Sequence, residues 1–333
     1  MKTAIVGCGN VAKVHAECLQ QLNDCQLTAF VDIKKERADI FASQYGGQGY
    51  TSLEELFTVQ KPDVLHICTP HYLHVPMAIQ ALQHGIHVFM EKPPAISRLQ
   101  WEMLYHAVDE SSCQLGICFQ NRYNPSVQIA KDLLSSGKAG KLIGARGIVT
   151  WNRDASYYST SDWRGKLDTE GGGALINQSI HTLDLLNYFL GKPLWTEASM
   201  ANHHLKSQIQ VEDTLEAFIS YESGNAVFFA TTAYCDDAPP LIELICENMK
   251  IRIEEPEITL YHHDKTVEKP LIPHSSPKGK SYWGNGHLNC ISDFYRCLKM
   301  NIPYSLNLKE IQNTALLMLA IYESARTYKP ITL

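Results

Sequence analysis

The sequence lacks any apolar run of the roughly 18 or more residues that a membrane-spanning helix requires. It also lacks an excess of positive charge: the formal net charge is −6, and lysine and arginine are spread along the chain. These two absences argue against a membrane protein, a polybasic membrane patch and a nucleic-acid-binding surface. The sequence contains no internal repeat and no low-complexity segment.

The ten cysteines include no CxxC pair. Several lie in apolar segments, where a free cysteine behaves as a small hydrophobic side chain. The first ten residues, MKTAIVGCGN, contain a short apolar run that glycines interrupt. That pattern is typical of a first β-strand rather than a secretion signal. We therefore expect a reduced, cytoplasmic protein.

What the sequence does contain is enough chain for two domains: 333 residues, of which 45% are hydrophobic. In the first third, short apolar strands alternate with helical patterns, which predicts βαβ units and a parallel sheet. Strands are expected at Thr3–Val6, Leu27–Val31, Val64–Cys68, Ile86–Met90 and Leu115–Phe119. Helices are expected at Val11–Gln21, Lys35–Gln44, Pro76–His84 and Leu99–Asp109.

After Gln120 the pattern changes to neighbouring strands with little helix between them, which predicts a mostly antiparallel sheet, open on one face. The strand-like segments are Leu142–Trp151, Asp213–Tyr221, Ala226–Tyr234, Leu241–Cys246, Lys250–Glu254 and Glu257–His262. A helix is expected after Gly173, and two more at Gly286–Lys299 and Leu308–Thr327. The prediction is an α/β domain over residues 1–120 and an α+β domain over residues 121–333.

A GxGxxA turn follows the first strand and opens a helix. Its glycines permit a tight turn and close backbone approach, and the helix N-terminus presents N–H groups to a pyrophosphate. The residues expected to contact a dinucleotide here are Gly7, Gly9, Asn10, Val11 and Ala12. The alternative is a glycine-containing turn in an unrelated α/β domain.

Asp32 strengthens the dinucleotide interpretation. It follows Ala12 by twenty residues, at the end of the second strand, where a carboxylate accepts hydrogen bonds from ribose hydroxyls. A Rossmann domain that binds NAD is therefore predicted, because Asp32 would repel the 2′-phosphate of NADP. Lys34, Lys35 and Arg37 follow closely, so NADP is the alternative and Arg37 is a candidate cofactor contact.

Glu91, Lys92 and Pro93 end another strand. Ligands of open α/β sheets bind beyond the carboxyl ends of strands, so Lys92 is expected where a cofactor and substrate meet. A partly desolvated lysine beside a cationic nicotinamide has a lowered pKa and can take a proton from an alcohol. The alternative is a solvent-exposed lysine that forms an ion pair with Glu91.

Two further segments allow more than one interpretation. His71 and His74 lie close enough in sequence to suggest zinc, but no cysteine or acidic residue offers companion spacing, so no metal is predicted. The segment EGGGALINQSIH places Asn177 and His181 four residues apart after three glycines. By itself it fits a phosphate loop, half of a metal site or the wall of a catalytic pocket.

Six motifs occur in order and together indicate a family. They are GxGxxA with Asp32, TPxxxH (Thr69, Pro70, His74), EKP (Glu91–Pro93), QNRYNP (Gln120–Pro125), WRG (Trp163–Gly165) and GGGxxxNxxxH (Gly171–His181). With them the chain resembles the glucose–fructose oxidoreductase/inositol dehydrogenase family, also called Gfo/Idh/MocA, over essentially its whole length. EKP and the glycine run that leads to His181 are the most specific elements.

The resemblance implies an NAD(P)-dependent enzyme that oxidises or reduces one carbon of a sugar, sugar derivative or cyclitol. It also implies an open sheet that often forms oligomer contacts, so a homodimer or homotetramer is expected. By position, Lys92 matches a lysine implicated in proton transfer, and His181 matches a histidine that binds the substrate hydroxyl or relays its proton. Cofactor contacts fall on Thr69, Pro70, His74, Glu91, Lys92, Asn121, Trp163, Arg164 and Tyr282. A cis Lys92–Pro93 bond is expected.

The sequence departs from the family pattern at Asn177, where many members have aspartate, and at His71, where asparagine is common. Asn177 can hydrogen-bond a substrate hydroxyl but cannot accept a proton as a carboxylate does. The glycine run is interpreted as a substrate wall in which small residues let the backbone approach cofactor and substrate. Asp184 is expected to be structural, and Tyr157, Tyr158 and Trp163 either stack on a sugar ring or anchor their loop.

Three functions remain open from the sequence. The first is an NAD-dependent dehydrogenase in which Lys92 and His181 act on a ring hydroxyl and Asn177 positions a hydroxyl. The second is a redox-neutral glycoside-cleaving enzyme with tightly held NAD, as some relatives are. The third is a non-catalytic regulator that binds NAD and a sugar; the intact EKP motif and His181 argue against it.

Overall fold

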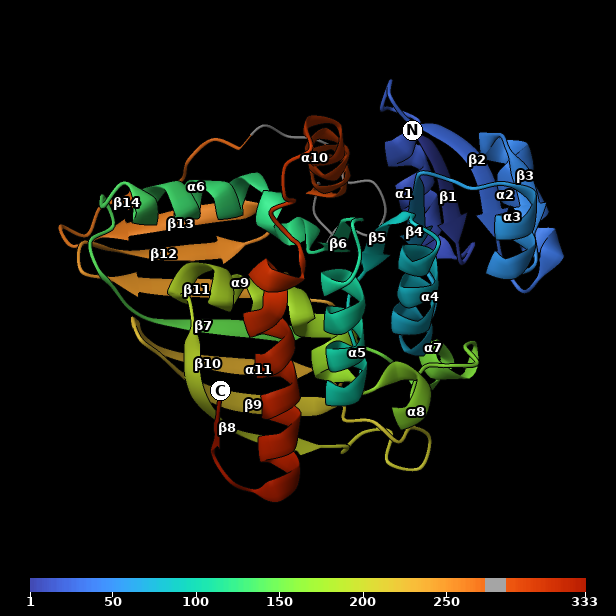
Figure 1. The fold of residues 1–333 in the computed structure, drawn as a ribbon. Coiled ribbons are helices and arrows are strands. Elements are labelled where there is room, and N and C mark those ends of the chain that lie inside the picture. The colour runs from blue at the N-terminus through green and yellow to red at the C-terminus, as the bar shows by residue number, and fades with distance from the viewer. Residues whose placement is uncertain (273–285) are drawn as a thin grey trace. The chain divides into compact units, whose positions relative to one another are not determined.

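The computed structural model describes residues 1–272 and 286–333. Their contacts divide the chain into two compact units (Figure 1). The first unit contains Met1–Gln120 together with His287–Ile311, and the second contains Asn121–Gly286 together with Gln312–Leu333. The sequence-based division differs from this one, because it assigned His287–Ile311 to the second domain.

The first unit is built on a six-stranded parallel sheet in the order β3-β2-β1-β4-β5-β6. Its strands are β1 (Lys2–Val6), β2 (Gln26–Val31), β3 (Gln48–Tyr50), β4 (Val64–Ile67), β5 (His87–Glu91) and β6 (Leu115–Cys118). Every residue of β4 and β6 is buried, because helices cover both faces of a parallel sheet of this kind. The predicted Rossmann sheet is confirmed. The short strand β3 was not predicted.

The helices of the first 120 residues alternate with these strands. They are α1 (Asn10–Leu19), α2 (Lys35–Tyr45), α3 (Leu53–Val59), α4 (His71–Gln83) and α5 (Arg98–Asp109), followed by the 3₁₀ turn η1 (Gln120–Tyr123). Side-chain caps begin two of them: Ser52 accepts from the amide of Glu55, and Ser97 accepts from the amide of Gln100. Helix α4 begins five residues before the predicted start, with Pro76 inside it.

Helix α10 (Gly286–Met300) completes the first unit although it lies late in the sequence. The ring of Phe294 lies 5.2 Å from that of Phe89 on β5 and 5.2 Å from that of Tyr304. The segment after the helix also reaches the sheet edge, because the amide of Ile117 donates to the carbonyl of Leu306. These contacts give the reason that His287–Ile311 belongs with the first unit.

The second unit is built on a nine-stranded sheet in the order β14-β13-β12-β11-β7-β10-β9-β8-β15. Its strands are β7 (Leu142–Thr150), β8 (Pro193–Ala201), β9 (Thr214–Tyr221), β10 (Gly224–Thr231), β11 (Leu241–Cys246), β12 (Met249–Glu254), β13 (Glu257–His262), β14 (Val267–Glu268) and β15 (Ile331–Thr332). Among the described strands of this sheet, only β7 and β10 pair in parallel, so the prediction of a mostly antiparallel sheet is confirmed.

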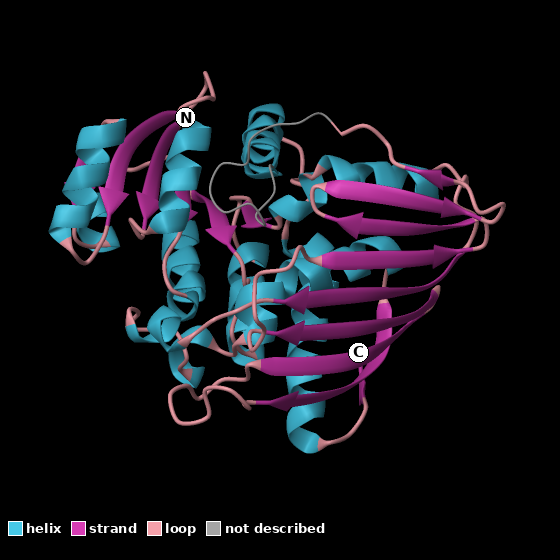
Figure 2. Cartoon of the chain, turned by 180° about the vertical axis from the view of Figure 1, so that it is seen from behind, coloured by secondary structure: helices cyan, strands magenta, loops and turns pink. Residues whose placement is uncertain are grey.

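Helices α6 (Pro125–Ser135), α9 (Ile180–Leu190) and α11 (Leu308–Thr327), whose first turn belongs to the first unit, lie on one face of this sheet, and Figure 2 looks onto the other face. The second unit also contains the short helices α7 (Ala155–Ser159) and α8 (Leu167–Glu170) and the π-helix η2 (Ala174–Ser179). Strands β9 and β12 alternate buried and less buried residues, as expected for a sheet packed on one face. The exposed apolar side chains of the sheet include Ile143, Phe218, Val227 and Ile245.

Two general predictions can be compared with the structure. Among the described residues, none of the helices combines the length and apolar character that a membrane span needs. All ten cysteines are free thiols, as the absence of a CxxC pair suggested. Seven of them are buried: Cys8, Cys18, Cys68, Cys118, Cys246, Cys290 and Cys297.

Candidate functional site

The GxGxxA segment has the predicted context of strand, turn and helix. Gly7 follows β1 with a φ of +86°, and a Cβ there would lie 2.7 Å from the carbonyl oxygen of Cys68, so glycine is required. Gly9 precedes α1, and a Cβ there would meet no atom within 4 Å, which leaves open space at the helix N-terminus. A pyrophosphate can approach the backbone there.

Asp32 is anchored next to this turn at the end of β2. One carboxylate oxygen accepts from the amide of Cys8 at 2.9 Å, and the other accepts from the amide of Lys34 at 2.9 Å. Each carboxylate oxygen has a second acceptor position for ribose hydroxyls. Arg37 lies exposed in the first turn of α2. The residues of the turn and Asp32 therefore fit the adenosine and pyrophosphate of a dinucleotide.

The end of β4 provides a second group of predicted cofactor contacts. The hydroxyl of Thr69 is buried and has no hydrogen-bond partner among the described residues, which suits it to a ligand. The ring nitrogens of His74 lie 2.9 Å from the carbonyl oxygens of Thr69 and Pro93. His74 thus ties the ends of β4 and β5 together. It is a buried structural contact of the turn, with half-buried Pro70 before the helix.

Glu91 ends β5 and Lys92 follows it directly, and the predicted cis Lys92–Pro93 bond is present. Glu91 is buried, and its carboxylate lies 2.9 Å from Nε2 of His15 on α1. Burial raises the pKa of Glu91, but its interactions with His15, the hydrogen bond first, outweigh this effect, with smaller contributions from His287 and Lys92. The net pKa therefore lies well below its usual range, and Glu91 is ionised in the resting protein beside half-buried Lys92.

A cluster of potential metal ligands lies at the same place. Among the described residues, His15, Glu91 and Cys118 bring one ligand atom each within 4.8 Å of one another. The hydrogen bond between His15 and Glu91 accounts for the closest pair without an ion. The two histidines considered for zinc, His71 and His74, are both buried with ring centroids 5.7 Å apart, and neither belongs to this cluster.

The glycine run of the second unit makes room for protein rather than for a ligand. A Cβ on Gly172 would lie 2.0 Å from the hydroxyl of Tyr322, and one on Gly173 would lie 2.1 Å from the carbonyl oxygen of Glu212. The expectation that these glycines bring the backbone close to cofactor and substrate is therefore wrong for these two positions. Their absent side chains let η2 pack against α11 and the segment before β9.

Asn177 and His181 follow in different helices: Asn177 lies in η2 and His181 in the first turn of α9, both half-buried. The Asn177 amide donates to the carboxylate of Glu170 and lies 3.4 Å from the hydroxyl of Tyr157. Sequence reasoning had assigned Glu170 no role. Its place directly before the glycine run, seven residues from Asn177, was the available signal.

Glu170 has an unusual protonation behaviour. It is 1% exposed, and burial raises its pKa from the usual 4.5 to about 7. The amide of Gly165 and the side chain of Asn177 both donate to it and oppose the rise, while the nearby carboxylate of Glu212 adds to it. Glu170 therefore supplies, beside Asn177, a carboxyl group that titrates near neutral pH.

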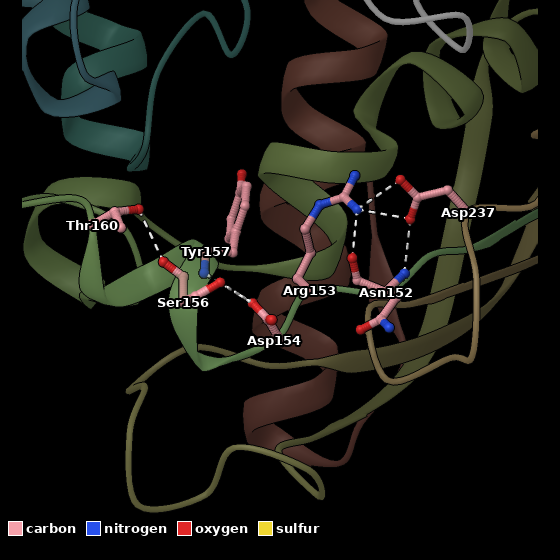
Figure 3. A pocket seen from close by; sticks show the side chains of 7 residues that line it. All are labelled: Asn152, Arg153, Asp154, Ser156, Tyr157, Thr160 and Asp237. Carbon is pink, nitrogen blue, oxygen red and sulfur yellow. Dashed lines mark hydrogen bonds and ion pairs between the residues drawn. The ribbon is translucent and has the colours of Figure 1, made fainter.

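A hollow of about 450 Å³ opens beside this network (Figure 3). Arg153 forms an ion pair with Asp237 at 2.8 Å on one side of the hollow. Its Nε donates to Gln178, and the Gln178 amide donates to the hydroxyl of Tyr157 at 2.8 Å. The remaining lining residues are Asn152, Asp154, Ser156 and Thr160. The wall is therefore rich in hydrogen-bonding groups, which suits a polyhydroxylated ligand.

The aromatic residues of the loop divide between the two roles left open by the sequence. Tyr158 is buried in a cluster with Leu205, Ile209 and Val211, so it anchors the loop. Tyr157 lines the hollow, and the guanidinium of Arg164 lies 4.3 Å from its ring centre. Trp163 is half-buried.

Other predicted residues are placed as follows. Asp184 accepts a two-point ion pair from Arg122 and a hydrogen bond from Thr314, which confirms its structural role. Asn121 has a buried carbonyl oxygen, and Arg164 a buried Nε, without a hydrogen-bond partner among the described residues. Tyr282 lies outside the described residues. The first unit thus brings together the predicted residues up to Glu91 and Lys92, and the second brings together Asn177, Arg164 and the Glu170 network.

Comparison with known families identifies both parts of the chain. Residues 1–119 match the model of an oxidoreductase family with an NAD-binding Rossmann fold, GFO_IDH_MocA. Residues 127–252 match the GFO/IDH/MocA C-terminal domain. The two matches are consecutive and belong to one family.

Individual relatives are dehydrogenases of sugars. D-glucoside 3-dehydrogenase of Escherichia coli is 28% identical over 70% of this chain and 70% of its own length. Glucose-6-phosphate 3-dehydrogenase of Bacillus subtilis is 27% identical over 65% of this chain and 63% of its own length. The WlbA dehydrogenase of Bordetella pertussis, solved with NADH and UDP-GlcNAcA, is 26% identical, with a TM-score of 0.86 over 100% of this chain and 98% of that one.

Proposed function

This chain belongs to the GFO/IDH/MocA family of oxidoreductases, and from that premise we propose that it oxidises the hydroxyl at C3 of a glucose-configured ring. The predicted class, an NAD-dependent oxidoreductase acting on sugar hydroxyls, is confirmed by its relatives. The position of attack is our inference: two relatives with different substrates are both named as 3-dehydrogenases. That shared position is the observation that carries the proposal.

NAD, when bound, accepts the hydride from the substrate carbon. The turn from Gly7 to Ala12 and the carboxylate of Asp32 hold its pyrophosphate and ribose. Thr69 offers its buried hydroxyl as a further contact. The carboxylate of Asp32, fixed by two backbone amides, disfavours the 2′-phosphate of NADP.

Lys92 is the proposed general base. It is half-buried at the carboxyl end of β5, and as a neutral amine it takes the proton of the reacting hydroxyl. Its neighbour Glu91 is ionised in the resting protein, so the ammonium that forms is stabilised by this negative charge. His181 binds the substrate hydroxyl, as the matching family position indicates.

Asn177 and Tyr157 are proposed to position ring hydroxyls of the substrate. The amide of Asn177 is oriented by the carboxylate of Glu170, and the hydroxyl of Tyr157 by the amide of Gln178. Because Glu170 titrates near neutral pH, it provides the acidic group that the amide of Asn177 lacks. Asn177 therefore acts through Glu170 rather than as a proton acceptor.

The test is a panel of glucose, a methyl glucoside, glucose 6-phosphate, levoglucosan, myo-inositol and UDP-GlcNAc with NAD and with NADP. NADH formation is followed by absorbance. Product from each active substrate is then reduced with borodeuteride, and mass spectrometry locates the deuterium. We expect deuterium at C3 of a glucose-configured ring and a preference for NAD.

Other outcomes separate the competing functions. Deuterium at C2 or C4, or activity confined to myo-inositol, would contradict the proposed position of attack. Cleavage of a nitrophenyl glucoside without net NADH would indicate the redox-neutral reaction. Binding of NAD and sugar without any chemistry across the panel would indicate a regulator.

We also expect the chain to form a homodimer or homotetramer. The open face of the nine-stranded sheet exposes Ile143, Phe218, Val227 and Ile245, which supports burial of this face against another copy. Light scattering coupled to size-exclusion chromatography measures the state. A monomer at micromolar concentration would contradict the expectation.

A further inference from the structure

A row of buried polar side chains crosses the first unit from Glu91, at the carboxyl end of β5, to Cys25, directly before the amino end of β2. Its members come from separate elements: His15 on α1, His66 on β4, Tyr295 on α10 and Thr3 on β1. Thr3, His15 and His66 are inaccessible to solvent, and Tyr295 is 5% exposed. Cys25, directly before β2, is only partly buried. The redox chemistry proposed above gives none of these five residues a role.

Each member is within hydrogen-bond distance of the next. Beyond the Glu91–His15 contact, Nδ1 of His15 lies 2.9 Å from Nδ1 of His66. Nε2 of His66 lies 3.0 Å from the hydroxyl of Tyr295, which lies 2.8 Å from the hydroxyl of Thr3. The thiol of Cys25 donates to the hydroxyl of Thr3 at 3.3 Å. The contacts therefore form one unbroken chain.

The ionised carboxylate of Glu91 fixes the direction of every donor. A carboxylate only accepts, so His15 donates from Nε2 and, when its ring is neutral, accepts at Nδ1. His66 must then donate from Nδ1 and accept at Nε2 from the hydroxyl of Tyr295. Tyr295 in turn accepts from Thr3, and Thr3 accepts from Cys25. All donors point toward Glu91.

Burial keeps the imidazole of His66 neutral, as this direction requires, because it lowers the pKa of His66 well below its usual value. The other titratable groups near the row include His287, whose pKa burial lowers to about 4, the buried thiol of Cys118 and, toward Cys25, the carboxylate of Asp63 and the N-terminal amine. The charge of Lys92 acts on Glu91.

The packing of the core does not by itself explain why polar side chains form this row. Buried polar groups cost free energy unless all are paired, and apolar side chains of similar size fill a core at least as well. Here two histidines, a tyrosine and a threonine are paired end to end across the core. An ordered row with a single donor direction is the arrangement that moves a proton without moving an atom far.

We propose that this row is a proton relay that connects Glu91, and through it Lys92, with the surface at Cys25. The proposal rests on the proton transfer assigned to Lys92. In one inward passage the Nε2–H bond of His15 breaks as an O–H bond forms on Glu91. His15 then takes the Nδ1 proton of His66, and His66 takes the hydroxyl proton of Tyr295. Tyr295 takes the proton of Thr3, Thr3 takes that of Cys25, and the thiolate takes one from water.

The balance of this step is one proton gained by Glu91 and one lost by water, with no electron transferred. When reduction of a ketone substrate has consumed the proton of Lys92, Glu91 transfers a proton to the neutral amine of Lys92. After the passage every donor points outward, so the same row accepts a proton from Glu91 and releases one at Cys25. That reverse passage serves alcohol oxidation.

The first arm of the test needs no substrate. In protein labelled with ¹⁵N-histidine, long-range ¹H–¹⁵N spectra identify which nitrogen of each ring carries hydrogen. We expect hydrogen on Nε2 of His15 and on Nδ1 of His66. Exchange of these hydrogens with D₂O is then compared in the wild type and in Tyr295→Phe, which keeps the ring and removes one hydroxyl. Exchange should slow at least ~10-fold in the variant, since the outer route is cut.

The control is Tyr304→Phe in the same unit. Tyr304 is as deeply buried, and its hydroxyl donates to the carbonyl of Cys290 and lies 3.1 Å from the thiol of Cys290, so the variant also loses buried hydrogen bonds. Its histidine exchange should stay within ~2-fold of the wild type. Thr3→Val removes the next hydroxyl of the row and repeats the test at a second site. Equal exchange in wild type, Tyr295→Phe and Thr3→Val, or hydrogen on Nε2 of His66, would overturn the relay.

The second arm uses whichever sugar of the panel turns over. Tyr295→Phe should lower kcat about 10-fold with little change in KM and should raise the solvent deuterium isotope effect, whereas Tyr304→Phe should not. Unchanged kcat in Tyr295→Phe would overturn a role of the row in turnover while leaving the dehydrogenase assignment intact. If no sugar turns over, the proposed function fails, and the exchange arm still decides whether the row conducts protons.

Discussion

Glu91 in the first unit and Glu170 in the second are both almost inaccessible to solvent, with exposed fractions of 7% and 1%, yet their pKa values move in opposite directions. Burial is the largest influence on both, and it raises both. The difference lies in the partners. Glu91 receives a hydrogen bond from His15, whereas Glu170 receives hydrogen bonds from amide groups and has the carboxylate of Glu212 nearby.

One residue type thus performs two tasks. Glu91 is ionised in the resting protein and provides a negative charge beside the proposed base Lys92. Glu170 changes charge near neutral pH and passes that change to Asn177 through a hydrogen bond. The direction of the pKa shift of a buried carboxyl group therefore depends on its hydrogen-bond donors and neighbouring charges, because burial by itself raises the pKa of both groups.

Removing the base should have the largest effect. Lys92→Ala is expected to lower kcat by ~10²–10⁴-fold, the usual contribution of a positioned proton acceptor. NAD affinity, measured by calorimetry, should remain close to that of the wild type. Lys138→Ala, at an exposed position in the second unit, is the control. Turnover of Lys92→Ala within a few-fold of the wild type would remove Lys92 from the mechanism.

Removing His15, the partner of Glu91, should raise the pKa of Glu91, so that Glu91 would then resemble Glu170. His15→Leu leaves a buried carboxylate unpaired, so the free energy of unfolding at pH 7.5 should fall by roughly 3–5 kcal/mol. Glu91 would then have a raised pKa, and the loss should be smaller at pH 5, where the carboxyl binds a proton. Denaturant unfolding at the two pH values measures this. Adding Glu91→Gln should restore part of the stability; a deficit equal at both pH values would contradict the explanation.

Glu170→Gln tests the raised pKa from the other side. Because the folded pKa of about 7 exceeds the usual 4.5, the folded protein binds the proton more tightly. This contribution to stability is complete below about pH 4.5 and is lost as the pH rises to about 7, by about 3 kcal/mol in all. The glutamine variant lacks this loss, so its stability relative to the wild type should increase between pH 5 and pH 7.5. A difference that does not change with pH would show that Glu170 does not titrate there.

Asn177→Asp should have the smallest effect. A second carboxylate beside Glu170 repels its negative charge and raises the pKa of the pair. The pH at which kcat/KM is half-maximal should move upward by roughly one unit, with the maximal rate within ~10-fold of the wild type. Asn177→Ser, which adds no charge, is the control. An unchanged pH profile would separate Glu170 from the catalytic step.

Local patterns made the first unit predictable from the sequence. The turn from Gly7 to Ala12 and Asp32 at a strand end each depend on a few neighbouring residues, whereas the cis Lys92–Pro93 bond was implied by the resemblance to the family. The alternation of strand and helix likewise follows from periodicity, and the parallel sheet follows from that alternation. The short elements β3 and α3 were not predicted, because they are too brief to show a hydrophobic pattern.

Contacts between residues far apart in the sequence could not be predicted, because local sequence patterns do not encode them. The hydroxyl of Tyr295 meets His66 across 229 positions of sequence, and His15 meets His66 across 51. Glu170 lies near Asn177 in sequence, but its pKa depends on burial and on Glu212, which only the folded chain supplies. The packing of Tyr322 against Gly172 is a third example. No single-sequence pattern encodes such pairs.

The late position of α10 has a consequence for the order in which the protein is made. The first 120 residues leave the ribosome with Phe89 and Gly116 uncovered, because Phe294 and Tyr304 pack against them only after most of the chain has been synthesised. The first unit therefore lacks the packing of α10 against Phe89 and Gly116 while most strands of the second sheet are being translated. A fragment that ends at Gln120 should bind chaperones and exchange its β5 and β6 amides rapidly, and a supplied peptide spanning Gly286–Ile311 should slow that exchange.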